Sequence, residues 1–150
     1  MLSADEIRDS QRAAWGRLSE SWEKWDSIIM DQLGPVGTAM IERLAIAEDQ
    51  EHLDIASGTG EPGLSIARLA PKGRVMLTDL SAEMLDVAAR RAQAQGIANI
   101  ETQVCSAATA SETCSLIISQ YSSGEDVTSS TSTSHSATSC SPAAVYTAVT

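Results

Sequence analysis

The sequence predicts an α/β domain in which a mostly parallel, doubly wound sheet carries helices on both faces and is preceded by N-terminal helices. Two observations support this fold class. Apolar segments typical of strands alternate with amphipathic segments typical of helices over residues 53–104. A glycine-rich turn within LDIASGTGEPG, residues 53–63, joins the first predicted strand to the helix that follows it. A strand, a glycine turn and a helix in this order present backbone N–H groups to a nucleotide-like ligand.

Residues 3–33 are predicted to form one amphipathic helix. Ser3 and Glu6 have the spacing of a capping box at its start, and Gly34–Pro35 is expected to end it. A second, shorter helix should run from Val36 to about Ala47. Apolar residues recur along the first helix at steps of three and four, on one stripe that holds all three tryptophans: Trp15, Leu18, Trp22, Trp25 and Ile29. By its pattern alone, this stripe packs the helix onto the domain.

The turn that follows the first strand carries three glycines, Gly58, Gly60 and Gly63. Glycine is needed where φ is positive or where a Cβ would keep a ligand off the backbone. The spacing also matches the dinucleotide fingerprint, which alone is a weak signal. The local charge argues against a pyrophosphate, because Asp54 precedes the turn, Glu61 lies within it and Pro62 lacks an N–H donor. A cationic, phosphate-free ligand such as S-adenosylmethionine fits better, and a corner that binds no ligand is the alternative.

Helical periodicity resumes after the turn and leads into a second strand. The apolar positions of this helix are Leu64, Ala67 and Leu69. Residues Arg74–Leu77 (RVML) form the strand, and Asp79 lies at its carboxyl end. A carboxylate there can accept hydrogen bonds from both hydroxyls of an adenosine ribose. A solvated turn acid is the alternative, and the glycine turn upstream favours the ligand role.

LDIASGTGEPG, together with GRVMLTDLSAEMLDVAARRA at residues 73–92, resembles the first two motifs of class I S-adenosylmethionine-dependent methyltransferases. The group that it resembles most is the one around the ubiquinone/menaquinone-biosynthesis methyltransferases, and the resemblance covers about residues 53–104. It implies a Rossmann-like methyltransferase fold with S-adenosylmethionine as the cofactor. Some positions depart from the family pattern. Ala56 stands where the first motif usually has Gly, and Ser106 stands where an acid usually contacts the adenine amino group. Cys114 and Ser115 stand where Phe and Asp are usual.

The resemblance also implies roles for individual residues. Gly58 and Gly60 would line the methionine part of the cofactor, and Asp79 would hold its ribose. Leu80 and Met84 would flank the adenine. The complete set of cofactor-binding residues predicted in this way is Asp54, Ala56, Ser57, Gly58, Gly60, Asp79, Leu80, Met84, Ser106 and Ala107. No catalytic base is predicted, because methyl transfer rests largely on proximity and orientation.

In the family, an N-terminal helix closes over the cofactor and shapes the acceptor pocket, so the resemblance implies a lid role for the tryptophan stripe. Aromatic faces suit a sulfonium through cation–π attraction. His52, just before the first strand, is expected at the surface, and His135 lies in a Ser/Thr tract. Neither histidine has a partner at helical spacing, and no metal site is predicted.

Downstream of Asp79 the alternation of helix and strand continues. Ser81 can cap a helix over Ala82–Gln95, and Gly96 supplies its C-terminal stop. The third strand is predicted at Asn99–Val104 and a fourth at Ser115–Ser119 (SLIIS). The buried face of the helix is predicted to consist of Met84, Leu85, Ala88 and Ala92.

The pattern then fails. Between Ser122 and Pro142, 13 of 21 residues are Ser or Thr, and Lys and Arg do not occur after Arg91. Such a tract predicts linker or disorder. Two interpretations stay open: a degenerate, flexible segment, or wrongly assigned residues from about position 105 onward. Residues 142–149 predict a strand that resembles the fifth strand of the family, and we expect the sheet to be truncated after it.

Composition limits the partners. The 150 residues carry 20 acidic and 10 basic side chains, which argues against a nucleic-acid groove, because phosphates require Lys and Arg. Three cysteines, an odd number without a signal peptide, favour a cytoplasmic location. No apolar run approaches the roughly 18 residues of a membrane span. The oligomeric state stays open.

These observations predict two parts, an N-terminal helical lid at residues 1–47 and an S-adenosylmethionine-binding α/β domain at residues 48–150. The predicted function is S-adenosylmethionine-dependent methyl transfer to a small-molecule acceptor, or the cofactor-binding fragment of such an enzyme. A non-catalytic ligand-binding or interaction domain is the first alternative. An NAD-dependent oxidoreductase is the second, disfavoured by the acids around the turn.

Overall fold

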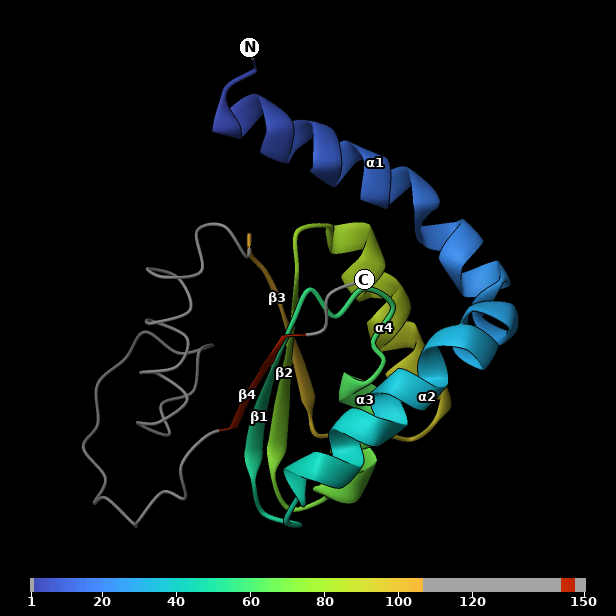
Figure 1. The fold of residues 1–150 in the computed structure, drawn as a ribbon, viewed down its shortest axis with the longest axis vertical. Helices are drawn as coiled ribbons and strands as arrows, with labels where there is room; N and C mark the ends of the chain where they lie inside the picture. Colours follow the sequence, from blue (N-terminus) through green and yellow to red (C-terminus); the bar gives the residue numbers. More distant parts are fainter. Residues whose placement is uncertain (1, 107–143, 148–150) are drawn as a thin grey trace, which may run out of the picture.

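The computed structural model describes residues 2–106 and 144–147 (Figure 1). Within these residues the strands form one parallel sheet with the order β3-β2-β1-β4. The strands are β1 (Glu51–Ile55), β2 (Arg74–Asp79), β3 (Ile100–Val104) and β4 (Ala144–Thr147). The chain steps from β1 to β2 to β3 in one direction, and β4 pairs on the other side of β1. This reversal of direction defines a doubly wound sheet, so the predicted α/β fold class is confirmed.

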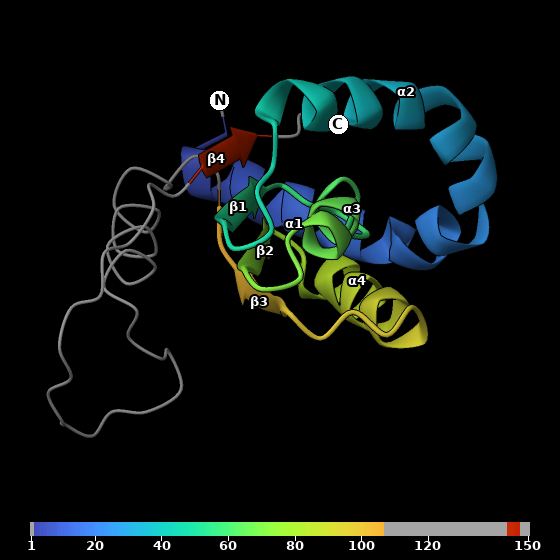
Figure 2. The ribbon, with the colours of Figure 1, turned by 90° about the horizontal axis from the view of Figure 1, so that it is seen from below.

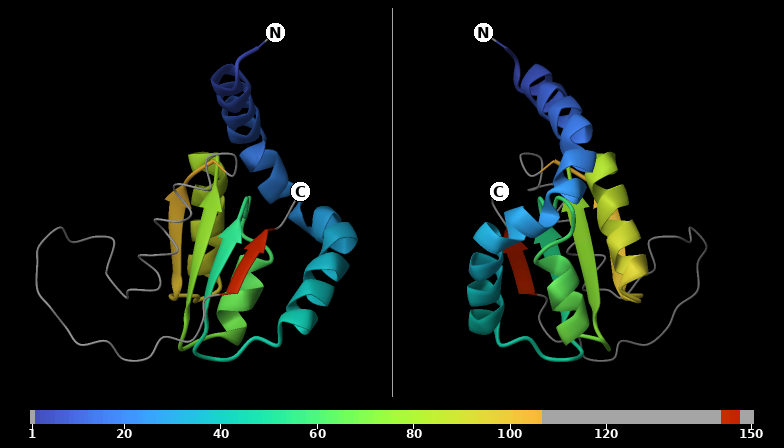
Figure 3. Two further views of the ribbon diagram at one scale, coloured as in Figure 1. Left: turned by 60° about the vertical axis from the view of Figure 1, so that its left-hand side comes forward. Right: turned by 90° about the vertical axis from the view of Figure 1, so that its right-hand side faces the viewer.

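The helices that connect β1, β2 and β3 lie on one face of the sheet (Figure 3). Right-handed crossovers that advance in one direction place their helices on the same face. The N-terminal helix pair, α1 and α2, follows an arc beside this layer (Figure 2), and α2 lies on the same side of the sheet as α3 (Figure 1). The helices are α1 (Ala4–Lys24), α2 (Asp26–Leu44), α3 (Gly63–Leu69) and α4 (Ala82–Ala94).

The core lies between this helix layer and the sheet. The predicted face of α4 is confirmed, because Met84, Leu85, Ala88 and Ala92 are all buried. In α3, Leu64 and Ala67 are buried as predicted, whereas Leu69 is half exposed at the end of the helix. The cluster at the centre consists of Leu64, Ile66, Ala67, Val75, Leu77, Leu85, Ala88 and Ala92. This packing fixes the edge of the sheet from which the candidate site is built.

The helix ends of the sheet part agree with the sequence. The Ser81 side chain accepts a hydrogen bond from the N–H of Met84 and caps α4. Gly96 adopts a left-handed conformation, φ 69°, just after this helix. Short-range capping chemistry therefore predicted these boundaries within one or two residues.

The prediction of a single helix over residues 3–33 is wrong. The capping box at Ser3 and Glu6 is present, but the helix breaks at Trp25, whose φ of −100° and ψ of 12° leave the helical region. A new helix begins at once with Asp26. The break turns the chain and divides the N-terminal part into two helices of similar length.

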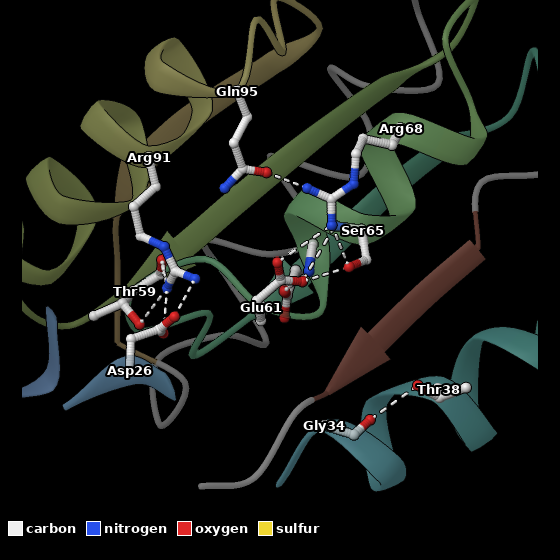
Figure 4. Close-up of polar contacts among 11 residues, drawn as sticks. Asp26, Gly34, Thr38, Thr59, Glu61, Ser65, Arg68, Arg91 and Gln95 are labelled. Atoms are coloured by element: carbon white, nitrogen blue, oxygen red, sulfur yellow. Dashed lines mark hydrogen bonds and ion pairs between the residues drawn. The ribbon is translucent and has the colours of Figure 1, made fainter. Parts of the chain in front are cut away.

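Gly34–Pro35 does not end a helix but lies inside α2. Proline removes one backbone donor and strains the preceding turn, and the neighbouring Thr38 hydroxyl donates to the Gly34 carbonyl at 3.1 Å (Figure 4). The stop comes at Ala45 instead, with φ 46° and ψ 53°. The helix end therefore uses a left-handed alanine, a signal that the sequence does not reveal.

The tryptophan stripe is only partly buried against the domain. Trp15 and Trp22 are half-buried, whereas Trp25 is 51% exposed and Leu18 is 43% exposed. At about 100° per residue, Leu18 and Trp25 lie roughly 60° and 80° around the helix from Trp15, while Ser19 lies closer to the inner face. Ser19 is accordingly buried. The prediction that all three tryptophans share one inner face is wrong for Trp25.

His52 is not at the surface, contrary to the sequence-based expectation. The first strand begins at Glu51 rather than at Leu53, and His52 is fully buried in it. Its strand is an inner strand, flanked by β2 and β4, and burial lowers the pKa of the imidazole. His52 is therefore a core residue of the sheet.

Several predictions fall outside the described residues. They concern the strand at Ser115–Ser119, the Ser/Thr tract at Ser122–Pro142, and His135. The strand predicted at residues 142–149 is confirmed at Ala144–Thr147, which pairs with β1. Among the helices that the structure describes, none has both the length and the apolar character that crossing a bilayer would need.

Candidate functional site

A cavity of about 870 Å³ opens at the carboxyl edge of the sheet, within the size range of small-molecule sites. One wall consists of residues that lie at or after the carboxyl ends of β1, β2 and β3: Ala56, Ser57, Gly58, Thr59, Glu61, Pro62, Asp79, Leu80, Met84, Cys105 and Ser106. The other wall comes from the N-terminal helix pair. Ligands of open α/β sheets bind in this position, outside the carboxyl ends of the strands.

The glycine turn, residues 56–62, has the backbone conformation that its sequence implies. Gly58 and Gly60 have φ values of 52° and 109°, and the Gly60 N–H donates to the Ser57 carbonyl at 2.8 Å. The Ser57 N–H donates to Thr78 of β2 at 2.9 Å. A Cβ at Gly58 would meet no atom within 4 Å, so the backbone there faces open space. Ala56 also has a positive φ, 60°, which is strained for alanine.

Asp79 holds this turn against the sheet. It is the last residue of β2 and is 9% exposed, so it is not a solvated turn acid. Its Oδ2 accepts from the Gly58 N–H at 2.9 Å, and its Oδ1 accepts from the Ser81 N–H at 2.9 Å. A carboxylate oxygen can accept two hydrogen bonds, so both oxygens keep capacity for a ligand that enters the cavity.

Asp54 supports the turn from beneath and does not line the cavity. It is 1% exposed, and its Oδ2 accepts from the Gly63 N–H at 3.0 Å. In the part of the chain that the structure describes, Oδ1 has no hydrogen-bond partner. Burial raises the pKa of this carboxyl to about 7; the Gly63 N–H opposes that rise, and the negative charges of Glu61 and Asp79 add to it.

Glu61 is held at the start of α3. Its Oε2 accepts from the Ser65 N–H at 3.2 Å and from the Ser65 hydroxyl at 2.7 Å (Figure 4). Arg68 lies 3.5 Å from Glu61 Oε1 and donates to the Ser65 hydroxyl at 2.7 Å. A carboxylate therefore already occupies the N-terminus of this helix, where a phosphate would otherwise be attracted. This geometry agrees with the prediction that the turn does not cradle a pyrophosphate.

The opposite wall is mainly apolar. The rings of Trp15 and Trp22 pack edge to face, with centroids 6.1 Å apart and an interplanar angle of 63°. The other apolar side chains of this wall come from α2: Met30, Leu33, Val36, Met40 and Ile41. The cavity thus has a polar floor on the sheet and an apolar wall on the helix pair.

Most of the residues predicted from the sequence lie together on the cavity. The lining includes Ala56, Ser57, Gly58, Asp79, Leu80, Met84 and Ser106. Asp54 and Gly60 lie behind the turn, and a Cβ at Gly60 would come within 2.9 Å of the Leu64 side chain. Ala107 lies outside the described residues.

Arg91 is the main residue of the site that the sequence did not predict. It lines the cavity, and its Nη1 donates to the carbonyl of Thr59 at 3.0 Å and to the hydroxyl of Thr59 at 3.1 Å. It also pairs with Asp26 of α2. One signal was available: Arg91 lies seven residues after Met84, on the same face of the helix.

The fold and the site define a doubly wound α/β domain with a nucleotide-type ligand cavity at its switch point. The model of the methyltransferase domain family matches residues 53–133, just over half of the chain. The chain therefore belongs to the methyltransferase domain family.

Individual relatives share shorter stretches. The release factor glutamine methyltransferase of Xylella fastidiosa (strain Temecula1) is 38% identical over 60 residues, which is 40% of this chain. The chain spans 22% of the length of the curated relatives that it matches.

Two solved structures are similar to a larger share of the chain. The DhpI–SAM–HEP complex has a TM-score of 0.52 and 28% identity, and the match covers 71% of this chain and 45% of that one. Phosphoethanolamine N-methyltransferase 1 of Haemonchus contortus, in complex with phosphoethanolamine and S-adenosylhomocysteine, has a TM-score of 0.57 and 19% identity, and the match covers 70% of this chain and 22% of that one. The second similarity concerns the fold alone.

Proposed function

We propose that the cavity binds S-adenosylmethionine and that the protein transfers the cofactor's methyl group to a small-molecule acceptor. The observation that carries this proposal is the placement of the Gly58 backbone and the Asp79 carboxylate side by side, on the cavity floor at the ends of β1 and β2. Membership of the methyltransferase domain family supports the same reaction class.

The residues of the floor fit this cofactor. The open space over Gly58 leaves room for the methionine part close to the backbone, and Asp79 can accept the ribose hydroxyls with its remaining lone pairs. Leu80 and Met84 would flank the adenine, with Ser106 at its edge. Asp54 and Gly60 contribute by holding the turn, not by contact with the ligand.

The charge of the lining also fits a cationic ligand. Three carboxylates, Asp26, Glu61 and Asp79, and one cation, Arg91, line the cavity within the described residues. The half-buried rings of the opposite wall can attract a sulfonium through cation–π interaction. The same carboxylates would repel an NAD pyrophosphate, because it is itself anionic.

When bound, S-adenosylmethionine supplies an electrophilic methyl group on its sulfonium. The residues of this chain then bind the cofactor and the acceptor, orient them toward each other and exclude water. Proximity and orientation can supply about 7–11 kcal/mol of the barrier reduction. No side chain of the described residues is assigned as a general base.

For the acceptor we propose an uncharged, largely apolar small molecule, in keeping with a place near the ubiquinone/menaquinone-biosynthesis methyltransferases. The wall from α1 and α2 offers two tryptophans and five aliphatic or thioether side chains, which would act as the lid of a two-part chain (residues 1–47 and 48–150). Arg91, the cation of the described lining, is already engaged by Asp26 and Thr59, so a phosphate-bearing acceptor would lack a counter-charge there. The cytoplasmic location is retained as a prediction from the cysteine content.

Calorimetry tests the proposal. The chain should bind S-adenosylmethionine or S-adenosylhomocysteine at about micromolar affinity or weaker and bind NAD far more weakly. Asp79→Ala should weaken binding at least tenfold, since a hydrogen bond to a charged group is worth about 1.5–3 kcal/mol, whereas Asp86→Ala, at an exposed position of α4, is the matched control. Equal binding of NAD, or equal loss in both variants, would contradict the proposal.

A further inference from the structure

A largely buried guanidinium joins the separate parts of the cavity wall. The Arg91 side chain on α4 is 15% exposed. On one side it reaches Thr59 at the centre of the glycine turn, and on the other it reaches Asp26 at the start of α2 (Figure 4). These partners lie 32 and 65 residues away along the chain. One side chain therefore connects the helix layer, the turn and the N-terminal helix pair.

The contact with Asp26 is a two-point ion pair. Arg91 Nη2 donates to Asp26 Oδ2 at 2.9 Å, and Nη1 lies 2.8 Å from Oδ1. The Nη2 contact is a charge-assisted hydrogen bond, which is stronger than one between neutral groups, and the Asp26 side chain is 30% exposed. Asp26 is the first residue of α2, directly after the break at Trp25. The pair therefore holds the N-terminal helix pair at its bend.

The contact with Thr59 holds the turn. Thr59 lies between the two glycines of positive φ and is 7% exposed. Its carbonyl and its hydroxyl both accept from Arg91 Nη1, while Asp79 holds the neighbouring Gly58 N–H. Asp79 of the sheet thus holds the turn at Gly58, and Arg91, which also binds α2, holds it at Thr59.

We infer that Arg91 is a positioning residue that couples the N-terminal helix pair to the glycine turn, so that order in one favours order in the other. Coupling of this kind is reciprocal and typically changes affinity by 5–150-fold. A ligand that touches both walls would bind more tightly to the coupled arrangement. That last consequence rests on the proposed function, whereas the coupling itself does not.

The chain offers a matched control for this arginine. Arg90, the preceding residue, also joins α4 to the N-terminal helix pair, through an ion pair with Glu23 at 2.6 Å. The side chains of Arg90 and Glu23 are 55% and 40% exposed, more than those of the pair formed by Arg91. Neither Arg90 nor Glu23 lines the cavity. Arg90→Met therefore removes an ion pair between α4 and α1, the other helix of the pair, without touching the turn.

The first experiment uses the chain without ligand. Hydrogen exchange reports on the Gly58 and Gly60 amides, which are both hydrogen-bonded. Quenching of tryptophan fluorescence reports on the helix pair, because Trp15, Trp22 and Trp25 are the only tryptophans of the sequence.

Arg91→Met should speed exchange at both glycines about tenfold and raise quenching, whereas Arg90→Met should leave the glycines unchanged. Asp26→Asn is the decisive variant, since Asp26 reaches the turn through Arg91, and it too should speed exchange at Gly58 and Gly60. The inference would be overturned if both Arg91→Met and Asp26→Asn loosened only the turn or only the helix pair. Circular dichroism of each variant verifies that the sheet part stays folded.

The second experiment measures S-adenosylhomocysteine binding by calorimetry in Arg91→Met, Asp26→Asn and the double variant. Each single change should weaken binding about tenfold, and the double variant should be no weaker than either, because both break the same connection. Fully additive losses would show that Arg91 acts by touching the ligand and would overturn the coupling. If the unaltered chain binds no S-adenosylhomocysteine, the proposed function fails, while the exchange experiment still decides whether the coupling exists.

Discussion

The two halves of the molecule are held together in different ways. In the sheet region, residues 51–104, the strands and helices bury a continuous apolar cluster. In the N-terminal helix pair, Ser19 is the one buried residue of α1 and α2 has none. The helix pair is attached mainly through half-buried side chains and the ion pairs of Arg90 and Arg91. A region with few buried apolar contacts opens at low free-energy cost, which suits a wall that must admit a ligand.

Exposed apolar side chains show the same contrast. Of the large apolar residues that are exposed in the described chain, two belong to the sheet region, Leu69 and Val104. The others belong to the N-terminal part: Leu2, Ile7, Leu18, Trp25, Ile28, Leu33 and Val36. The comparison teaches that the sheet region buries an apolar cluster of its own, against which Ile41 and Ile46 pack, whereas the helix pair keeps much of its apolar surface available at the cavity and beyond it.

The largest expected effect comes from matched isoleucines in the two regions. Ile66 in α3 is 1% exposed and Ile28 in α2 is 55% exposed. Ile66→Ala should lower the free energy of unfolding by about 2–5 kcal/mol, whereas Ile28→Ala should change it by less than about 0.5 kcal/mol. Urea denaturation followed by circular dichroism measures both. Similar losses in the two variants would show that the helix pair is part of the core.

A pH dependence should arise in the sheet region from Asp54. Because burial raises the pKa of this carboxyl from 3.8 to about 7, the folded chain binds a proton that the unfolded chain releases. Stability should therefore fall as pH rises from about 4 to about 7, by up to about 4 kcal/mol.

Asp54→Asn removes this titration. The variant should therefore become more stable relative to the unaltered chain as the pH rises over the same range. Asp31→Asn, at an exposed position of α2, is the control for loss of one charge. A difference that does not change with pH would show that Asp54 stays ionised in the fold.

Glycines in the two regions should respond in opposite directions. A Cβ at Gly63 would clash with the Leu77 side chain and come within 2.8 Å of Asp54 Oδ2, whereas a Cβ at Gly37 in α2 would make only an ordinary contact with the Pro62 side chain at 3.6 Å. Gly63→Ala should cost about 1–3 kcal/mol, and Gly37→Ala should stabilise α2 by about 0.5–1 kcal/mol. Thermal unfolding measures the first change and amide exchange in α2 the second. A harmless Gly63→Ala would mean that α3 can shift away from the sheet.

The smallest expected effect concerns the two left-handed alanines. Ala56 in the turn has a φ of 60°, and Ala45 at the end of α2 has a φ of 46°. Such strain costs about 1–2 kcal/mol, and glycine gives back part of the gain as entropy of the unfolded chain. Ala56→Gly should raise the global unfolding free energy by up to about 1 kcal/mol, whereas Ala45→Gly should slow exchange only within α2. No gain from Ala56→Gly would indicate that alanine is unstrained there.

The sequence predicted the sheet region well because its determinants are local. The order and approximate positions of the first three strands, the glycine turn and the cap at Ser81 follow from alternation and turn chemistry over a few residues. The prediction that His52 lies at the surface was wrong because its strand pairs with β2 and β4. A short stretch of sequence does not contain that information.

The break of the helix pair and the contacts of Arg91 could not be predicted for the same reason. The break at Trp25 is followed by Asp26, whose partner lies 65 residues away, and α2 continues through Gly34–Pro35 although the local signal favours a stop. Thr59 is 32 residues from Arg91. Contacts between residues far apart in the sequence therefore determine the ends of these helices and the position of Arg91.

The central claim is that the cavity between the sheet region and the helix pair is the cofactor site. Hydrogen exchange with and without S-adenosylhomocysteine tests it most directly. The ligand should slow exchange at Gly58 and Gly60 and also along α1 and α2, while the core of β2 stays unchanged. Protection confined to other parts of the chain, or none at saturating ligand, would contradict the claim.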